Sequence, residues 1–213
     1  MIDPSSIELS NFLTTWYGPP NRQVVTMPEQ YKNLPSPLHN WHALAARWTV
    51  PLVRNKKLLP PEEMITKNGK IIFMADPGDA IWGFDPENPS TVYEGRLYGD
   101  WVRLRETLTD FLIHNAVNEA AYNAPYAKSC ECVNDDHLTQ ILAPMTEVAF
   151  EGWHWPRTGH RIFASESLIA DVGPAMEDVE PWGNKPGFSE VQIGAITASS
   201  LEYLTNIPGI EWY

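Results

Sequence analysis

Three short runs of strand-forming residues, joined by turns too short to hold a crossover, constrain the fold most strongly. The runs cover residues 70–75, 80–84 and 91–97, and they are rich in Ile, Phe, Trp, Val and Tyr. The turns, residues 76–79 and 85–89, consist of turn-forming Asp, Pro, Gly and Asn with one Glu. A parallel pair needs a crossover of about a dozen residues or more, so these strands are expected to form an antiparallel sheet.

Helical patterns precede and follow this sheet. Each begins with a residue pair that favours a helix start: Asp3 with Pro4, Ser36 with Pro37, and Thr107 with Asp110. An apolar stripe at helical spacing follows each pair. We expect the first helix to end at Gly18 and the third at about residue 123, before Pro125.

The second half carries similar elements in a less regular pattern. A short helix is expected from Asp135 through Leu142 and a closing helix over residues 197–204. Strands are expected over residues 146–150, 161–164, 168–172 and 190–195. Residues 173–189 contain three prolines, three glycines and several acidic side chains, which predicts an irregular acidic loop.

These elements predict an α+β fold. We expect a central antiparallel sheet flanked by helices over residues 1–126, and a looser α+β part over residues 127–213 that packs on it as one unit. No apolar run is long enough to span a membrane, and residues 1–10 lack the pattern of an export signal, so a cytoplasmic location is expected.

The chain is strongly acidic, with 27 acidic and 15 basic residues and a formal charge of −12. Nucleic acid and anionic membranes are poor partners for such a surface, because phosphate binding depends on clustered Lys and Arg. A basic partner protein fits better. Charge that serves solubility alone is the alternative.

Common catalytic and metal-binding patterns are absent. The sequence has no glycine-rich nucleotide loop, no Gly-x-Ser-x-Gly and no His-x-x-x-His followed by Glu. Cys130, Cys132 and His137 lack both a fourth ligand and the usual spacing of a zinc site, so Cys130 and Cys132 are interpreted as reduced thiols. We therefore predict no catalytic residue, no metal and no cofactor.

Residues 34–126 resemble the SUKH superfamily, which includes fungal Smi and Knr cell-wall regulators and many bacterial immunity proteins. The similar positions are Leu34-Pro35, Trp41, Trp48, Leu58-Leu59-Pro60, Glu62-Glu63, Ile71-Ile72-Phe73, Trp82-Gly83, Asp85-Pro86, Trp101, Leu108 and Phe111-Leu112. The resemblance implies an α+β fold without catalytic residues. In the immunity branch it also implies direct binding to a toxin, often a nuclease or deaminase.

The resemblance and the acidic surplus together predict a non-enzymatic protein that neutralises a toxin by binding it. An intracellular scaffold or regulatory protein of the same fold is the alternative. The partner-binding residues are expected on the turns of the first sheet and on the acidic loop: Asp76, Asp79, Asp85, Glu87, Glu177, Asp178, Glu180 and Trp182. Trp182 is the candidate anchor, although a loop can also bury one aromatic residue to tether itself.

Overall fold

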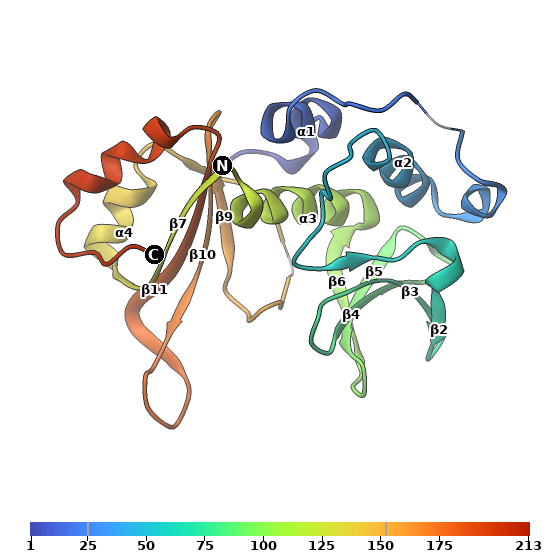
Figure 1. Cartoon of the computed structure of the whole chain (residues 1–213). Coiled ribbons are helices and arrows are strands. Elements are labelled where there is room, and N and C mark those ends of the chain that lie inside the picture. The colour runs from blue at the N-terminus through green and yellow to red at the C-terminus, as the bar shows by residue number, and fades with distance from the viewer. Residues whose placement is uncertain (25, 152) are drawn as a thin grey trace. The chain divides into compact units, whose positions relative to one another are not determined.

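The computed structural model describes residues 1–24, 26–151 and 153–213, and it confirms the predicted α+β class (Figure 1). In these residues the strands form two antiparallel sheets, one of six strands and one of five. The chain divides into two compact units. The N-terminal unit comprises Ser5–Glu119 and Glu151–Trp153; the C-terminal unit comprises Met1–Pro4, Ala120–Phe150 and His154–Tyr213. The division thus lies inside a helix, after Glu119.

The first sheet lies in the N-terminal unit and has the strand order β1-β3-β4-β5-β6, with β2 also paired to β3. Its strands are β1 (Lys57–Leu58), β2 (Ile65–Lys67), β3 (Lys70–Ala75), β4 (Ala80–Phe84), β5 (Thr91–Arg96) and β6 (Trp101–Thr107). The three predicted strands are β3, β4 and β5, and they pair antiparallel as expected.

Helical segments accompany this sheet. They are η1 (Pro4–Ser6), α1 (Leu9–Tyr17), η2 (Glu29–Asn33), α2 (Ser36–Ala45), η3 (Pro61–Glu63) and α3 (Leu108–Asn123), where η marks a 3-10 helix. α1, α2 and α3 lie on one face of the sheet, and none of the helices in the described residues covers the other face (Figure 1). The predicted cap of α3 is confirmed, because Thr107 Oγ1 accepts a hydrogen bond from the Asp110 N–H at 3.2 Å.

The predicted start of the first helix is wrong. Pro4 begins only a short 3-10 turn, and α1 begins at Leu9. The Glu8 carboxylate accepts hydrogen bonds from the backbone N–H groups of Ser10 and Asn11, at 3.1 and 2.7 Å, and so satisfies two otherwise free donors of the first turn.

Aromatic side chains fill the space between the first sheet and α3. Trp82, on the middle strand β4, is fully buried, as are Phe73 and Phe111. The Phe111 ring lies 5.6 Å from that of Phe73, and the Trp153 ring lies 5.2 Å from that of Phe111 and 6.2 Å from that of Trp82. The segment containing Trp153 therefore belongs to this core, although it lies far along the chain.

The second sheet lies in the C-terminal unit and has the order β7-β11-β10-β9-β8. Its strands are β7 (Tyr126–Asn134), β8 (Thr146–Glu147), β9 (Arg161–Ala164), β10 (Leu168–Met176) and β11 (Asn184–Ala195). Two helices accompany it, α4 (Asp135–Leu142) and the 3-10 helix η4 (Ala198–Asn206). The predicted C-terminal α+β part is thus a sheet with its own helices and core.

One face of the second sheet packs against α4 and η4. Ile141 and Leu204 are buried with Val191 and Ile193 in one hydrophobic cluster. The end of α3 approaches β11 closely, because a Cβ added at Gly194 would lie 2.7 Å from the Ala121 carbonyl oxygen. Glycine is required at this position for the backbones to come together.

In this half, one prediction is corrected and one strand was not predicted. Most of the stretch predicted as an irregular loop belongs to β10 and β11, because Met176 pairs with Asn184 across the two strands. β7 was not predicted, since its sequence, Tyr-Ala-Lys-Ser-Cys-Glu-Cys-Val-Asn, shows little apolar alternation. Both cysteines lie on β7 as free thiols, with Cys130 buried and Cys132 exposed.

Among the described residues, no helix has the length and apolar character needed to cross a membrane.

Candidate protein-binding surface

The β10–β11 hairpin extends past the rest of its sheet. β9 pairs with β10 only along residues 169–172, and β7 pairs with β11 only along residues 188–195. We define the outer arms as residues 173–176 and 184–187. Here β10 pairs only with β11, through Gly173 with Glu190, Pro174 with Ser189 and Met176 with Asn184, and of residues 184–187 only Asn184 has a strand partner. Four residues of strand reach about 14 Å, so the tip stands well away from the paired part of the sheet. Figure 1 shows this hairpin as the long orange projection.

Apolar side chains are exposed at the tip, which we define as residues 176–183. Trp182 is 63% exposed and Val179 is 70% exposed, whereas buried positions are usual for such residues. The tip loop is closed by the Glu177 N–H, which donates to the Gly183 carbonyl at 2.9 Å. The option that Trp182 is buried as a loop tether is therefore wrong, and its indole is available to a partner.

Acidic side chains surround these apolar groups. Asp178 and Glu180 are exposed, and Glu177 is partly buried. Lys185 Nζ lies 3.5 Å from a carboxylate oxygen of Asp178, but Asp178 is 89% exposed, so this pair screens the acidic tip only weakly. The tip thus keeps a net negative charge beside exposed apolar groups.

A buried ionic network fixes the root of the hairpin. His160 Nδ1 lies 2.9 Å from Asp171 Oδ1 on β10, and its Nε2 lies 3.2 Å from Glu190 Oε1 on β11, at ion-pair distance without good hydrogen-bond geometry. Tyr122 donates to Asp171 Oδ2 at 2.9 Å, and Arg157 pairs with Glu190 at 2.6 Å. The network joins both strands of the hairpin to the segment before β9.

The charge state of His160 follows from these neighbours. Burial by itself would lower the pKa of the imidazole, but the carboxylates of Asp171 and Glu190 outweigh it and raise the pKa to about 9. Burial would likewise raise the pKa of Glu190, yet His160 and Arg157 lower it. His160 is therefore a cation at neutral pH and holds two carboxylates on adjacent strands.

The predicted acidic residues of the first sheet do not form one patch. Asp76 and Asp79 lie in the β3–β4 turn, whereas Asp85 and Glu87 lie in the β4–β5 turn, at the other end of β4. β4 has five residues, so the two turns are about 17 Å apart. These four residues cannot act as a single acidic edge.

Most of these carboxylates already have a partner within the chain. Asp76 Oδ1 accepts the Ala80 N–H at 2.9 Å, as expected for an aspartate in a turn. Asp79 pairs with Arg96, and Asp85 lies 2.9 Å from Lys70 Nζ, which together with the Glu87 N–H lowers the pKa of Asp85. Glu87 is exposed, and among the described residues it has no cationic partner.

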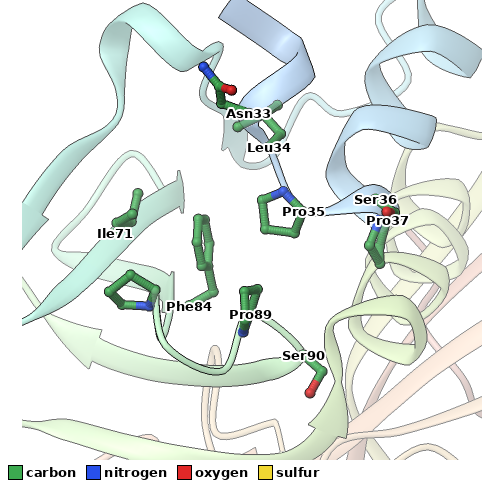
Figure 2. A pocket seen from close by; sticks show the side chains of 10 residues that line it. Asn33, Leu34, Pro35, Ser36, Pro37, Ile71, Phe84, Pro89 and Ser90 are labelled. Carbon is green, nitrogen blue, oxygen red and sulfur yellow. The ribbon is translucent and has the colours of Figure 1, made fainter.

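An apolar hollow of about 560 Å³ lies beside the β4–β5 turn (Figure 2). Figure 2 shows Pro35, Phe84 and Pro89 facing one another across it. The full lining is Asn33, Leu34, Pro35, Ser36, Pro37, Ile71, Phe84, Pro86, Pro89 and Ser90. None of these ten side chains titrates near neutral pH, so the hollow suits an apolar group and not acid or base catalysis.

A second buried polar cluster lies in the N-terminal unit. Glu119 Oε2 accepts the backbone N–H groups of Arg54 and Asn55 at 2.8 and 3.0 Å, and its Oε1 lies 3.3 Å from Lys56 Nζ. The side chains of Lys56 and Glu119 are fully buried. These contacts attach the segment before β1 to α3, which is a structural role.

The described residues contain no group of three or more His, Cys, Asp or Glu side chains arranged to hold a metal ion. Comparison with protein-family models, curated proteins and solved structures found no match to this chain. The hairpin tip is thus the strongest candidate site. Sequence reasoning identified its residues but missed the His160 network, whose signal would have been a histidine and two acidic residues on neighbouring strands.

Proposed function

We propose that the protein is a non-enzymatic binding protein whose hairpin tip contacts a basic protein partner. The observation that carries this proposal is the 63% exposure of Trp182 on a projecting, acidic hairpin. Tryptophan is enriched among the residues that contribute most to binding energy. Covering exposed apolar groups with a partner removes them from water, which lowers the free energy of the complex.

The two kinds of side chain have different tasks in this proposal. Glu177, Asp178 and Glu180 attract a basic surface over a distance and so raise the association rate. Trp182 and Val179 lose contact with water on docking and so slow dissociation. The His160 network supports both tasks, because it holds the root of the hairpin and limits the entropy lost on binding.

We further propose that the partner is a toxin and that the protein acts as its immunity protein. The SUKH-like pattern of residues 34–126 supports this, together with the formal charge of −12. A nuclease must hold phosphate in a basic cleft, and an acidic tip with an aromatic side chain is complementary to such a cleft.

The test measures binding to the product of a toxin gene encoded next to this one. The variant Glu177→Lys/Asp178→Lys/Glu180→Lys should weaken binding at least about 100-fold and abolish protection, and Trp182→Ala should weaken it at least about 10-fold. The matched control is Glu131→Lys/Glu202→Lys/Glu211→Lys, which makes the same charge change at exposed positions of the same unit away from the tip.

If both triple variants lose the same binding affinity, the net charge of the protein determines binding and the position of the charges at the tip does not. Unchanged binding in the tip variant would remove the tip from the interface. If the unmutated protein binds no neighbouring toxin, the immunity proposal fails, and a scaffold or regulatory role becomes the better explanation.

A further inference from the structure

Two arginines on β6 lack a carboxylate partner. Arg103 and Arg105 are exposed, while Leu104 and Glu106 between and after them are buried. In the part of the chain that the structure describes, neither arginine forms an ion pair. By contrast, Lys70 on β3 pairs with Asp85, and Arg96 on β5 pairs with Asp79.

Acidic residues outnumber basic ones by 27 to 15 in this chain. Two arginines side by side, left without a carboxylate partner, form a local positive surface on a protein of formal charge −12.

Two aromatic rings, those of Tyr93 and Trp101, lie beside the arginines on the same face of the sheet. Arg103 is the cross-strand partner of Tyr93, and Trp101 precedes Arg103 by two residues on β6. The Trp101 ring extends over the neighbouring strands, because a Cβ added at Gly95 would lie 2.8 Å from it and one added at Gly83 would lie 3.2 Å from it.

A hydrogen bond and two lysine side chains hold these rings in place. Trp101 Nε1 donates to the Lys67 carbonyl at 3.1 Å, and Lys67 Nζ lies 5.5 Å from the centre of the Trp101 ring. Lys70 Nζ lies 4.4 Å from the centre of the Tyr93 ring. We define Tyr93, Trp101, Arg103 and Arg105 as the arginine face. In the part of the chain that the structure describes, no helix covers this side of the sheet (Figure 1).

We propose that the arginine face binds an extended segment of a protein partner that carries acidic side chains at alternate positions. Residues two apart in a strand lie about 7 Å from each other and point to the same side. An extended segment with Asp or Glu at every second position has the same spacing, so it can present one carboxylate to each of Arg103 and Arg105. Each guanidinium can then bind its carboxylate with two parallel hydrogen bonds.

An acidic polypeptide fits this face better than a nucleic acid does. Nucleic-acid binding gains its affinity from many phosphate contacts, and two arginines on an acidic protein supply few. The inference goes beyond the proposed function, because it concerns the other compact unit and a ligand of opposite charge.

The test uses the full chain and a fluorescein-labelled peptide of alternating Thr and Glu, with fluorescence anisotropy at low ionic strength. The alternating Thr-Glu peptide should bind, and a peptide of alternating Thr and Gln should bind at least about 10-fold more weakly. A peptide of equal composition with its glutamates in one block tests the spacing, and it should also bind more weakly.

The variant Arg103→Glu/Arg105→Glu should raise the Kd for the Thr-Glu peptide at least about 10-fold. Its matched control, Arg22→Glu/Lys32→Glu, makes the same charge change at exposed positions and should leave the Kd within about 2-fold. Titration of the unmutated protein followed by NMR gives a second readout, in which amide shifts should concentrate on β5 and β6.

Equal weakening in both double variants, or shifts away from β5 and β6, would overturn the proposal. Preferential binding of a single-stranded oligothymidylate over the Thr-Glu peptide would assign the face to nucleic acid instead. Self-association in sedimentation that the Arg103→Glu/Arg105→Glu variant abolishes, without peptide binding, would assign the face to a second copy and would likewise overturn the proposal.

Discussion

Gly173 shows how one missing side chain shapes the root of the hairpin. A Cβ at this position would lie 2.3 Å from the His160 ring, a distance that no real contact allows. The imidazole therefore occupies the space that a side chain of β10 would take, within reach of Asp171 and Glu190. The sequence shows the glycine and the histidine, but only the register of β9, β10 and β11 brings them together.

Trp82 and Trp182 illustrate opposite uses of one residue type, and a pair of substitutions tests the difference. Trp82 is fully buried and donates to Glu94 at 3.2 Å, so Trp82→Ala should lower the free energy of unfolding by about 3–5 kcal/mol in urea titrations. Trp182→Ala removes an exposed side chain and should change it by less than about 0.5 kcal/mol. Equal stability of the two variants would refute the placement of Trp82 in the core.

The His160 network predicts how stability changes with pH. The pKa of His160 is about 9 in the folded protein and near 6.5 when unfolded, so its contribution is complete below about pH 6.5. It declines as pH rises, because the unfolded chain releases the proton first, and it is lost once pH passes about 9. Unfolding free energies at pH 6 to 10 should therefore show a decline that His160→Gln lacks.

Subtracting the pH profile of His160→Gln from that of the unmutated protein removes contributions from other groups. Parallel profiles for His160→Gln and the unmutated protein would show that His160 has the same pKa in both states, contrary to the network described above.

Among the elements, those with strong local signals were predictable and those fixed by long-range pairing were not. β3 and β4 have the predicted bounds because apolar β-forming runs end at Asp-Pro turns. β7 is a polar strand, and the outer arms of β10 and β11 contain proline and glycine, so their strand character comes from pairing and not from propensity.

The candidate binding residues were likewise predictable where the signal is local and not where it depends on long-range pairing. Glu177, Asp178, Glu180 and Trp182 could be identified as partner-binding candidates from their place in an acidic segment rich in proline and glycine. Their position on a projecting hairpin could not, because it depends on the pairing of Met176 with Asn184. The acidic turns of β3, β4 and β5 were identifiable too, but alternate turns of a meander lie at opposite ends, and Lys70 and Arg96 come from other strands to pair with them.

Amide hydrogen exchange should separate the two parts of the hairpin. The inner part, residues 169–172 and 191–195, is paired on both sides, whereas in the outer arms β10 pairs only with β11 and residues 185–187 have no strand partner. Local opening of a two-stranded ribbon costs less free energy, so the amides of Met176, Asn184, Lys185 and Gly187 should exchange at least about 100-fold faster. Uniform protection along both strands would mean that the arms are covered by further contacts.

At the scale of the whole molecule, charge and local surface act on different steps of binding. The formal charge of −12 produces a long-range field that guides any basic partner, whichever surface finally docks. The tip adds a local concentration of negative charge beside Trp182, while the arginine face presents the opposite sign. A protein with such a surface should discriminate partners by where their charges lie.

Kinetic measurements against the proposed toxin partner should resolve the contributions of charge and of the local surface. The association rate constant should fall at least about 10-fold as salt rises from low to physiological concentration, because ions screen the field between the acidic tip and a basic cleft. The tip variant Glu177→Lys/Asp178→Lys/Glu180→Lys should flatten this salt dependence.

Trp182→Ala should leave the association rate nearly unchanged and raise the dissociation rate, because an anchor that becomes buried in the interface acts after the encounter. Surface plasmon resonance over a salt series measures both constants, and a Trp182→Ala effect confined to association would contradict its role as an anchor.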